Sequence, residues 1–142
     1  MRSAGKGRLG PDEKEQMKLR IKGNSMRLRV SPSEMTRLLA VGRVEETIHF
    51  GPEEDAKLTY ALEHAEHAGD MSLRHQGQTI TVVISTRDAQ EWASGEQVGM
   101  YGVAGADQTR VELAVEKDFA CLDKGEGENR DTYPHPQQGT AC

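Results

Sequence analysis

Hydrophobic and polar residues alternate with a period of two along eight short segments of the chain. A period of two is typical of a β-strand that has one buried and one solvated face. Strands of this kind favour antiparallel sheets, because the strands of parallel sheets are buried on both faces and lack the alternation. The predicted strands cover residues 17–22, 25–30, 43–50, 57–64, 71–76, 79–84, 97–104 and 109–117.

The buried face that this alternation defines consists of aliphatic residues, methionines and one tyrosine. Its predicted members are Leu19, Ile21, Met26, Leu28, Val30, Val44, Ile48, Leu58, Tyr60, Leu62, Leu73, Ile80, Val82, Ile84, Val98, Met100, Val111, Leu113 and Val115. Two helices with apolar stripes are expected to pack on the same face, since each stripe needs an apolar partner.

Both helices carry start and stop signals. Ser31 and Ser85 are predicted N-cap residues, and Glu34, three positions after Ser31, completes a capping box. Gly42 and Gly95 are predicted to end the helices, because glycine readily adopts the left-handed conformation that follows many helices. The two helices are therefore short and lie between strands.

The same order of elements occurs twice. When the segment that begins at Met17 is placed over the segment that begins at Met71, Leu, Arg and Gly recur at matching positions. In each copy a glycine, Gly23 or Gly77, stands in a two-residue connection, where it supplies the positive φ of a tight hairpin turn. We therefore predict an α+β fold with an internal duplication of a ββαββ unit. Its mainly antiparallel sheet is either open or closed into a barrel, and two short helices cover the apolar face. The copies cover residues 17–63 and 71–116.

One domain is expected, with a segment of different character at each end. Residues 1–16 are rich in glycine and charge and are predicted to form a disordered N-terminal extension. Residues 124–142 are rich in glycine and proline and are predicted to form a flexible C-terminal tail. The domain between them spans residues 17–123.

Composition narrows the classes of function. The net charge of −5 lacks the basic character typical of proteins that bind nucleic acid. No apolar run approaches the roughly 20 residues of a membrane helix, and residues 1–16 lack the apolar stretch of a secretory signal. We therefore expect a cytoplasmic protein with neither nucleic acid nor a membrane as partner. Cys121 and Cys142 form no C-x-x-C pair, and no cofactor is predicted.

A strip of positive charge is the most informative polar feature. The two-residue turn at Gly23 fixes the register of the first hairpin, so that Arg20 faces Arg27 and Lys18 faces Arg29 on the side away from the core. Like charges directly opposite one another destabilise a hairpin by a few tenths of a kcal/mol or more. Some other group should offset this repulsion.

Two explanations of the strip remain open. In the first, carboxylates of neighbouring strands, among them Glu112 and Glu116, form a lattice of surface ion pairs. In the second, the strip binds an anionic small molecule or an acidic protein, as guanidinium groups do. Only one of the four charges recurs in the second copy. The candidate anion-binding residues are Lys18, Arg20, Arg27, Arg29 and Arg74.

The opening of the repeat resembles a family of short bacterial hypothetical proteins of unknown function, which implies a fold but no activity. The likeness spans roughly residues 17–136, and such proteins begin near Met17, so residues 1–16 look like an extension. The segments that carry it are Lys18-Leu19-Arg20-Ile21-Lys22-Gly23-Asn24-Ser25, Val44-Glu45-Glu46-Thr47, Val115-Glu116-Lys117-Asp118-Phe119-Ala120-Cys121-Leu122 and Tyr133-Pro134-His135-Pro136.

The duplicated arrangement is also similar, at the level of fold, to the triphosphate tunnel hydrolases. That resemblance implies a closed barrel in which arginines hold phosphates while Glu112 and Glu116 hold Mg²⁺ or Mn²⁺. The Glu-x-Glu-x-Lys motif of the family's first strand is absent, and Arg27-Leu28-Arg29 stands in its place. The likeness is therefore one of architecture alone.

These observations favour a non-enzymatic binding module for an anionic ligand or an acidic partner. One alternative is a metal-dependent phosphohydrolase of the tunnel type. A second alternative is a structural protein that self-associates, for instance as a homodimer, through exposed sheet edges. Closure of the sheet discriminates among them, because a hydrolase of this type needs a closed channel.

Overall fold

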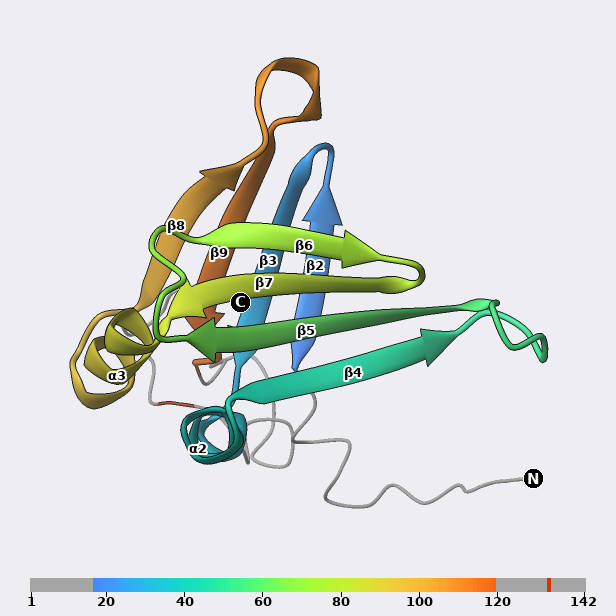
Figure 1. The fold of residues 1–142 in the computed structure, drawn as a ribbon. Coiled ribbons are helices and arrows are strands. Elements are labelled where there is room, and N and C mark those ends of the chain that lie inside the picture. Colours follow the sequence, from blue (N-terminus) through green and yellow to red (C-terminus); the bar gives the residue numbers. More distant parts are fainter. Residues whose placement is uncertain (1–16, 120–132, 134–142) are drawn as a thin grey trace.

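The computed structural model describes residues 17–119 and Tyr133. The predicted extension 1–16, residues 124–142 other than Tyr133, and both cysteines lie outside the described residues. Eight strands, two α-helices and a short 3₁₀ turn follow one another along the chain (Figure 1). They are β2 (Lys18–Lys22), β3 (Ser25–Val30), α2 (Pro32–Val41), β4 (Arg43–His49), β5 (Lys57–Ala65), β6 (Ser72–Gln76), β7 (Thr79–Ser85), α3 (Thr86–Ser94), β8 (Gly99–Ala104), η1 (Asp107–Thr109) and β9 (Val111–Lys117).

The strands form two open four-stranded sheets, which confirms the α+β class and leaves no closed barrel among the described residues. One sheet has the order β2-β3-β9-β8 and the other the order β4-β5-β7-β6. The central pairs, β3 with β9 and β5 with β7, are parallel, and all other pairs are antiparallel. We call them the β3/β9 sheet and the β5/β7 sheet. The strands of one run across those of the other (Figure 1).

The element order β-β-α-β-β occurs twice, and each sheet takes one hairpin from each half of the chain. The β3/β9 sheet combines β2-β3 from the first half with β8-β9 from the second, and the β5/β7 sheet does the reverse. The parallel registers correspond, since Arg27 pairs with Ala114 where Thr81 pairs with Ala61. The two halves therefore correspond in element order and in parallel register, and each contributes one hairpin to each sheet.

Local signals form the turns and helices as predicted, with one exception. Gly23 and Gly77 have φ values of 56° and 57° in the hairpin turns. Ser31 accepts from the backbone N–H of Glu34 and completes the capping box, and Ser85 caps α3 in the same way without one. Gly42 ends α2 with a left-handed φ of 98°, but Gly95 is extended with a φ of −106°. After α3 the chain therefore continues in an extended conformation at Gly95, and residues 96–98 connect it to β8.

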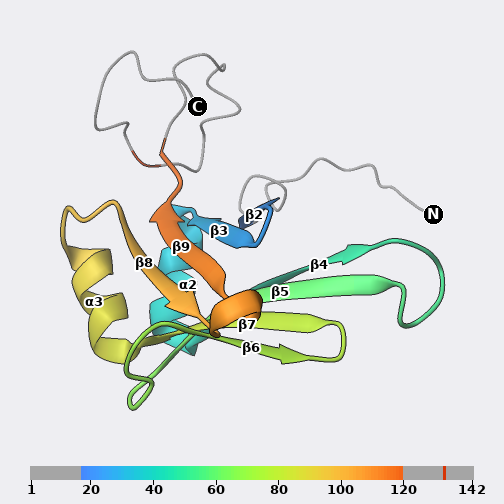
Figure 2. The same cartoon turned by 90° about the horizontal axis from the view of Figure 1, so that it is seen from above.

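The core lies between the two sheets and is closed at one end by both helices. Both helices lie at one end of the strands, α3 beside the ends of β5 and β7 and α2 beside the start of β4 (Figure 1), and from above α2 is seen behind β8 and β9 (Figure 2). Trp92 is fully buried, and its indole N–H donates to the carbonyl of Val98 at 3.3 Å. Met17, which the alternation pattern did not assign to the core, is only 1% exposed, and Tyr60 donates to its carbonyl at 2.8 Å.

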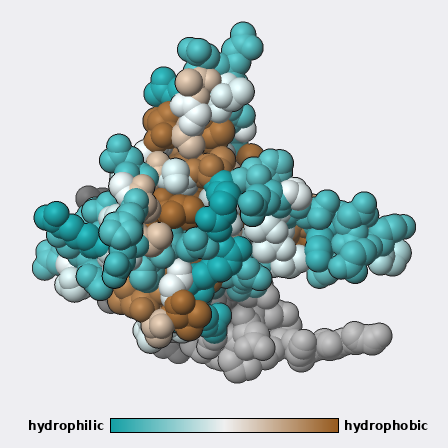
Figure 3. Space-filling view, viewed as in Figure 1, coloured by the Kyte–Doolittle hydropathy of each residue, from teal (hydrophilic) through white to brown (hydrophobic). Residues whose placement is uncertain are grey.

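Three predicted core residues are exposed: Ile21 at 56%, Ile48 at 49% and Val98 at 40%. Ile21 and Ile48 lie near the ends of β2 and β4, where each hairpin projects beyond the crossing sheet. Hydrophobic side chains are visible over the projecting part of the β3/β9 sheet, above β6 (Figure 3). Val98 precedes β8, and its carbonyl accepts from the backbone N–H of Lys117 on β9 at 2.9 Å while its side chain stays partly exposed. The alternation was correct, but it does not say how far the partner sheet extends.

Tyr133 contacts the body of the domain, unlike the structureless tail predicted for its segment. It bridges to Phe119, and its N–H donates to the carbonyl of Asp118 at 2.7 Å. Its ring lies 5.8 Å from the ring of Phe119 and 5.4 Å from Nζ of the buried Lys117. Burial lowers the pKa of Lys117, whose ammonium also donates to the carbonyl of Gly95. Tyr133 thus covers the end of β9.

Candidate functional site

The predicted positive strip lies on the outer face of the β3/β9 sheet. Lys18 pairs with Arg29 and Arg20 pairs with Arg27, which confirms the predicted register. The next row places Lys22 beside Ser25. Across β9 and β8, the same face continues through the alternate residues of each strand. They are Glu112, Ala114, Glu116, Gly99, Tyr101 and Val103.

Carboxylates near the end of β9 offset part of the strip. Glu116 lies 3.5 Å from Nε of Arg27 and 3.8 Å from Nε of Arg29, and it accepts from the hydroxyl of Tyr101 at 2.8 Å. Lys18 pairs with the buried Asp118 at 3.0 Å. The ion-pair explanation of the strip is thus correct for this row of the sheet.

The other half of the strip has no such compensation. Among the described residues, Arg20 and Lys22 form no ion pair, and neither does Glu112 on the same face. Five cationic side chains therefore share this face with three carboxylates, those of Glu112, Glu116 and Asp118. In a protein with a net charge of −5, this is a local excess of positive charge.

A hollow of about 590 Å³ opens on this face, and we call it the groove. One side is cationic, formed by β2 and β3, and the other side is the edge strand β8. The partly exposed Ala114 lies between the two sides. The side chains of this face that line the groove are Arg20, Lys22, Ser25, Arg27, Tyr101, Val103, Glu112 and Ala114.

Tyr101 is held in place although 62% of it is exposed. Its hydroxyl donates to Glu116, which sits diagonally across the sheet. Partial desolvation of the phenol, followed by the neighbouring carboxylate, raises the pKa of Tyr101 above its usual value of 10.0. The phenol therefore stays protonated and continues to donate, which fixes the ring beside the groove.

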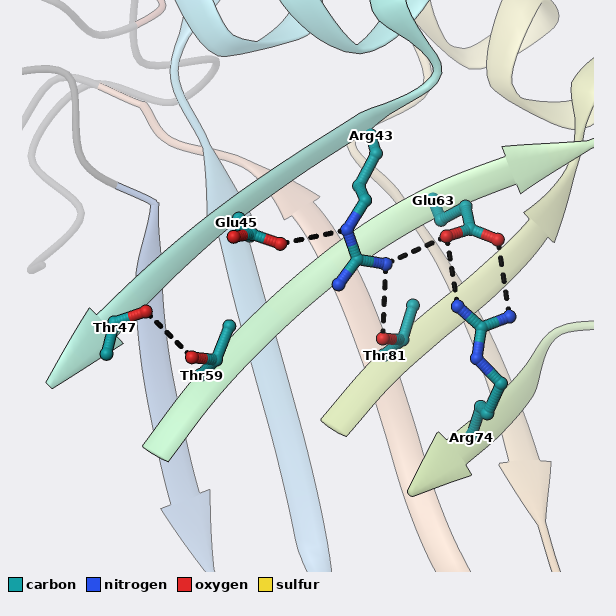
Figure 4. A network of polar contacts seen from close by, with 7 residues as sticks. All are labelled: Arg43, Glu45, Thr47, Thr59, Glu63, Arg74 and Thr81. Atoms are coloured by element: carbon teal, nitrogen blue, oxygen red, sulfur yellow. Dashed lines mark hydrogen bonds and ion pairs between the residues drawn. The ribbon is translucent and has the colours of Figure 1, made fainter. Parts of the chain in front are cut away.

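The corresponding face of the β5/β7 sheet carries a closed network of polar contacts (Figure 4). Arg43 donates to Glu45 at 2.9 Å, to Glu63 at 2.8 Å and to the hydroxyl of Thr81 at 3.3 Å. Arg74 donates to both carboxylate oxygens of Glu63, at 3.0 and 3.3 Å. Hydrogen bonds from Arg74, and secondarily from Arg43, hold the pKa of Glu63 below its usual value of 4.5.

Strand registers identify which residues correspond between the two faces. Arg43 pairs with Glu63 where Gly99 pairs with Glu116, so glycine stands where the other sheet has its central arginine. By the same registers Val44 corresponds to Met100, because four residues separate α3 from β8 and only one separates α2 from β4.

Two further exchanges distinguish the faces. Glu45 corresponds to Tyr101, which removes a carboxylate, and Thr81 corresponds to Arg27, which adds a cation. The central alanines of the two faces differ in exposure as a consequence. Ala61 is 1% exposed beneath its network, whereas Ala114 is partly exposed. One face is filled and neutralised, and the other is open and cationic.

Local packing also requires a glycine at position 99. A Cβ at this position would lie 2.7 Å from the carbonyl of Val115, 2.7 Å from Cγ of Glu116 and 3.1 Å from the hydroxyl of Tyr101. Any side chain here would push apart the hydrogen-bonded pair that orients the tyrosine. The glycine thus permits the contact between Tyr101 and Glu116 at the edge of the groove.

The predicted site residues are therefore only partly brought together. Lys18, Arg20, Arg27 and Arg29 share one face, but Arg74 lies on β6 in the other sheet and is paired with Glu63. Arg74 is therefore not part of the candidate site, because its hairpin, β6-β7, belongs to a different sheet from the hairpin β2-β3. Sequence reasoning missed Tyr101, Val103 and Ala114, although alternation along β8 and β9 already placed them opposite the core.

The tunnel arrangement of Glu112 and Glu116 does not form. Both project from the same face of β9, but four residues along a strand separate their Cα atoms by about 13 Å. Glu116 is already held by Tyr101, Arg27 and Arg29. In the described part of the chain, no three His, Cys, Asp or Glu residues are grouped closely enough to hold a metal ion.

A second hollow, of about 490 Å³, lies on the other side of β8. Asp70, Asp88 and Glu91 give it an acidic lining, and Tyr101 and Val103 border both hollows. The positive groove thus adjoins an acidic surface across a single edge strand. The sign of the charged side chains therefore changes from one side of β8 to the other.

Comparison with known proteins gives a family and no activity. A model of a family of unknown function, DUF7009, matches residues 17–137. The chain belongs to this family. The DUF7009 match begins at the residue from which the fold is described and includes Tyr133. Searches of curated proteins and of solved structures found no match. None of the helices in the described ranges is long and apolar enough to cross a membrane.

Proposed function

We propose that this DUF7009 protein binds a small anionic molecule, of the phosphate-bearing kind, in the groove of the β3/β9 sheet. The observation that carries the proposal is the exchange of Arg43 for Gly99 between the two sheets. The β5/β7 face closes over its alanine with an arginine and two carboxylates. The β3/β9 face keeps an open hollow lined by Arg27, which pairs with Glu116, and by Arg20 and Lys22, which form no ion pair in the described part of the chain.

The arrangement of cations supports the choice of ligand. Arg20 and Arg27 lie on adjacent strands, and paired guanidinium groups offer several N–H donors to the oxygens of one phosphate. Their mutual repulsion, which costs a few tenths of a kcal/mol or more in the empty protein, is relieved when an anion lies between them. Lys22 and Ser25 extend the donor set along the groove.

The size of the hollow favours a small molecule over an acidic protein. Its volume of about 590 Å³ falls in the range of pockets that enclose small ligands. A protein partner needs about 800 Å² of contact on each side, which extends well past the cationic strands. We favour binding over catalysis as the activity of the groove, because Glu112 is the one carboxylate among the described residues that line it and no histidine or cysteine lines the groove beside it.

Binding is tested by thermal unfolding of the full chain at low ionic strength, with inorganic pyrophosphate as the probe. A ligand at a hundredfold excess over its dissociation constant adds about 2.7 kcal/mol to the free energy of unfolding. The variants Arg20→Met and Arg27→Met should lose most of this gain. Arg74→Met is the matched control, because Arg74 corresponds to Arg20 and belongs to the filled face.

The proposal fails if pyrophosphate does not stabilise the wild type. It also fails if the Arg74 variant loses the response as fully as the Arg20 variant, since the effect then follows total charge rather than the groove. A response that survives in all three variants places the binding elsewhere on the molecule. Each of these results is read from the same set of melting curves.

We also infer that the two halves arose by internal duplication. The repeated order of elements, the matching hairpin glycines and the corresponding parallel registers support this origin. On this account the positive groove is a divergence of one copy, in which a neutral network was replaced by an open cationic surface.

A further inference from the structure

We infer that the anion bound in the groove carries a flat ring, as a nucleotide does, and that the ring rests against Tyr101. This inference depends on the proposed function, because it assigns a chemical class to the ligand of the same site. It draws on the side of the groove opposite the cations, which an inorganic anion does not need.

The first observation is the way in which Tyr101 is held. An aromatic side chain that is 62% exposed gains little from burial, yet its hydroxyl is bonded to Glu116 at 2.8 Å. The hydrogen bond restrains the ring before any ligand arrives, so that binding costs less conformational entropy. In the other sheet the corresponding residue is Glu45, which accepts a hydrogen bond from Arg43 and has no aromatic ring.

The second observation is the apolar character of this side of the groove. Val103 follows Tyr101 on the same face of β8 and is 45% exposed. Ala114, next to Tyr101 on β9, presents only a methyl group between the ring and Arg27. A solvated sheet face that bears two exposed apolar side chains opposite cations matches a ligand that is charged at one end and apolar at the other.

Spacing across the sheet fits such a ligand. Adjacent strands lie about 4.8 Å apart, so the backbones of Arg27 and Tyr101, which flank β9, are separated by about 10 Å. A phosphate held between Arg20 and Arg27 leaves room for a sugar above Ala114 and for a base against Tyr101. Glu112, which forms no ion pair in the described part of the chain, can accept hydrogen bonds from ligand hydroxyl or amino groups.

The ring contact is tested by comparing ADP with inorganic pyrophosphate by calorimetric titration of the full chain at low ionic strength. Both probes carry a diphosphate, and pyrophosphate has at least as much negative charge, so tighter binding of ADP cannot come from charge. Stacking of one base on an aromatic side chain corresponds to a gain of about 5- to 150-fold in affinity. We expect ADP to bind more tightly by a factor in this range.

Two variants separate the ring from the hydroxyl. Tyr101→Leu should abolish the advantage of ADP, so that ADP and pyrophosphate bind this variant with affinities within about threefold of each other. Tyr101→Phe keeps the ring and should keep most of the advantage. Circular dichroism of both variants checks that the fold is retained.

The outcomes distinguish this inference from the function on which it rests. If pyrophosphate and ADP bind equally well to the wild type, the ring contact is refuted and the anion site stands. If ADP binds more tightly but Tyr101→Leu preserves the advantage, the ring rests elsewhere and the assignment to Tyr101 is wrong. If neither probe binds, the ring contact and the proposed function are both overturned.

Discussion

Replacing Arg27 and Arg43 with methionine, one at a time, tests whether the two polar faces differ in the way that their contacts indicate. Both arginines lie on the outer face of a sheet, at similar exposure: the side chain of Arg27 is 39% exposed and that of Arg43 is 30% exposed. Methionine keeps much of the apolar stem and removes the charge. The comparison therefore isolates the guanidinium group in the protein without ligand.

The expected cost at Arg43 follows from three short contacts. Its guanidinium donates to Glu45, Glu63 and Thr81 at 2.9, 2.8 and 3.3 Å. Hydrogen bonds to charged groups contribute about 1.5–3 kcal/mol when buried and about 0–1 kcal/mol when exposed. Because roughly a third of this side chain is exposed, we expect Arg43→Met to lose about 1–2 kcal/mol of unfolding free energy.

The expected cost at Arg27 is close to zero. Its Nε lies 3.5 Å from Glu116, and that carboxylate keeps its bond from Tyr101 and its contact with Arg29. Against this small loss stands the relief of the cross-strand repulsion with Arg20, worth a few tenths of a kcal/mol. The free energy of unfolding should therefore change by no more than about 0.5 kcal/mol, in either direction.

Urea unfolding at low ionic strength, followed by the fluorescence of the buried Trp92, measures both changes. A difference of about 1 kcal/mol also corresponds to about 4–8 °C in the melting temperature of a domain of this size. If Arg27→Met loses as much stability as Arg43→Met, the strip is a second structural network. The contrast between a structural network on one face and a weakly paired Arg27 on the other is then refuted, and the groove loses its main support.

Two further predictions concern the closed face and the core. Because the pKa of Glu63 is held below 4.5 in the folded protein, its ion pairs stabilise the fold above that pH and are lost as pH falls through the lowered pKa. The stability gap between the wild type and Glu63→Gln should therefore shrink between about pH 6 and about pH 3 in urea titrations, and a constant gap would contradict the assignment. Met17→Ala should lower the free energy of unfolding by about 2–4 kcal/mol, because a side chain that is 1% exposed leaves a cavity when truncated; a loss below about 1 kcal/mol would show that it does not pack.

The parts of the fold that depend on neighbouring residues were predictable from the sequence. Gly23 and Gly77 required the hairpins, Ser31 and Glu34 formed the capping box, and the two-residue turn fixed the register of Arg20 against Arg27. Each of these features is set within a few residues by backbone sterics or a local hydrogen bond. The positive strip was therefore predicted correctly from the first hairpin alone.

The parts that depend on distant neighbours were not predictable in the same way. Alternation along β3 and β9 shows which face of each strand is polar, but it is the same whichever strand lies alongside. The pairing of Ser25 with Glu112 joins the two ends of the domain, and it brings Tyr101 to the groove. For the same reason the sequence could not separate one sheet from two, nor show that Arg74 belongs elsewhere.

Because the two halves exchange hairpins, the connection from β5 to β6 holds together two segments that must pair with each other to complete both sheets. A chain that ended after β5 would leave β3 and β5 without their parallel partners. The corresponding strands of a second copy match those two edges, so a half-length chain could complete both sheets only as a dimer. Residues 66–71 join the two halves, so that they associate within one molecule instead of between two. Short flexible linkers give effective concentrations in the millimolar range for such an association. Folding of the full chain is thereby independent of protein concentration, which a dimer of halves could not achieve.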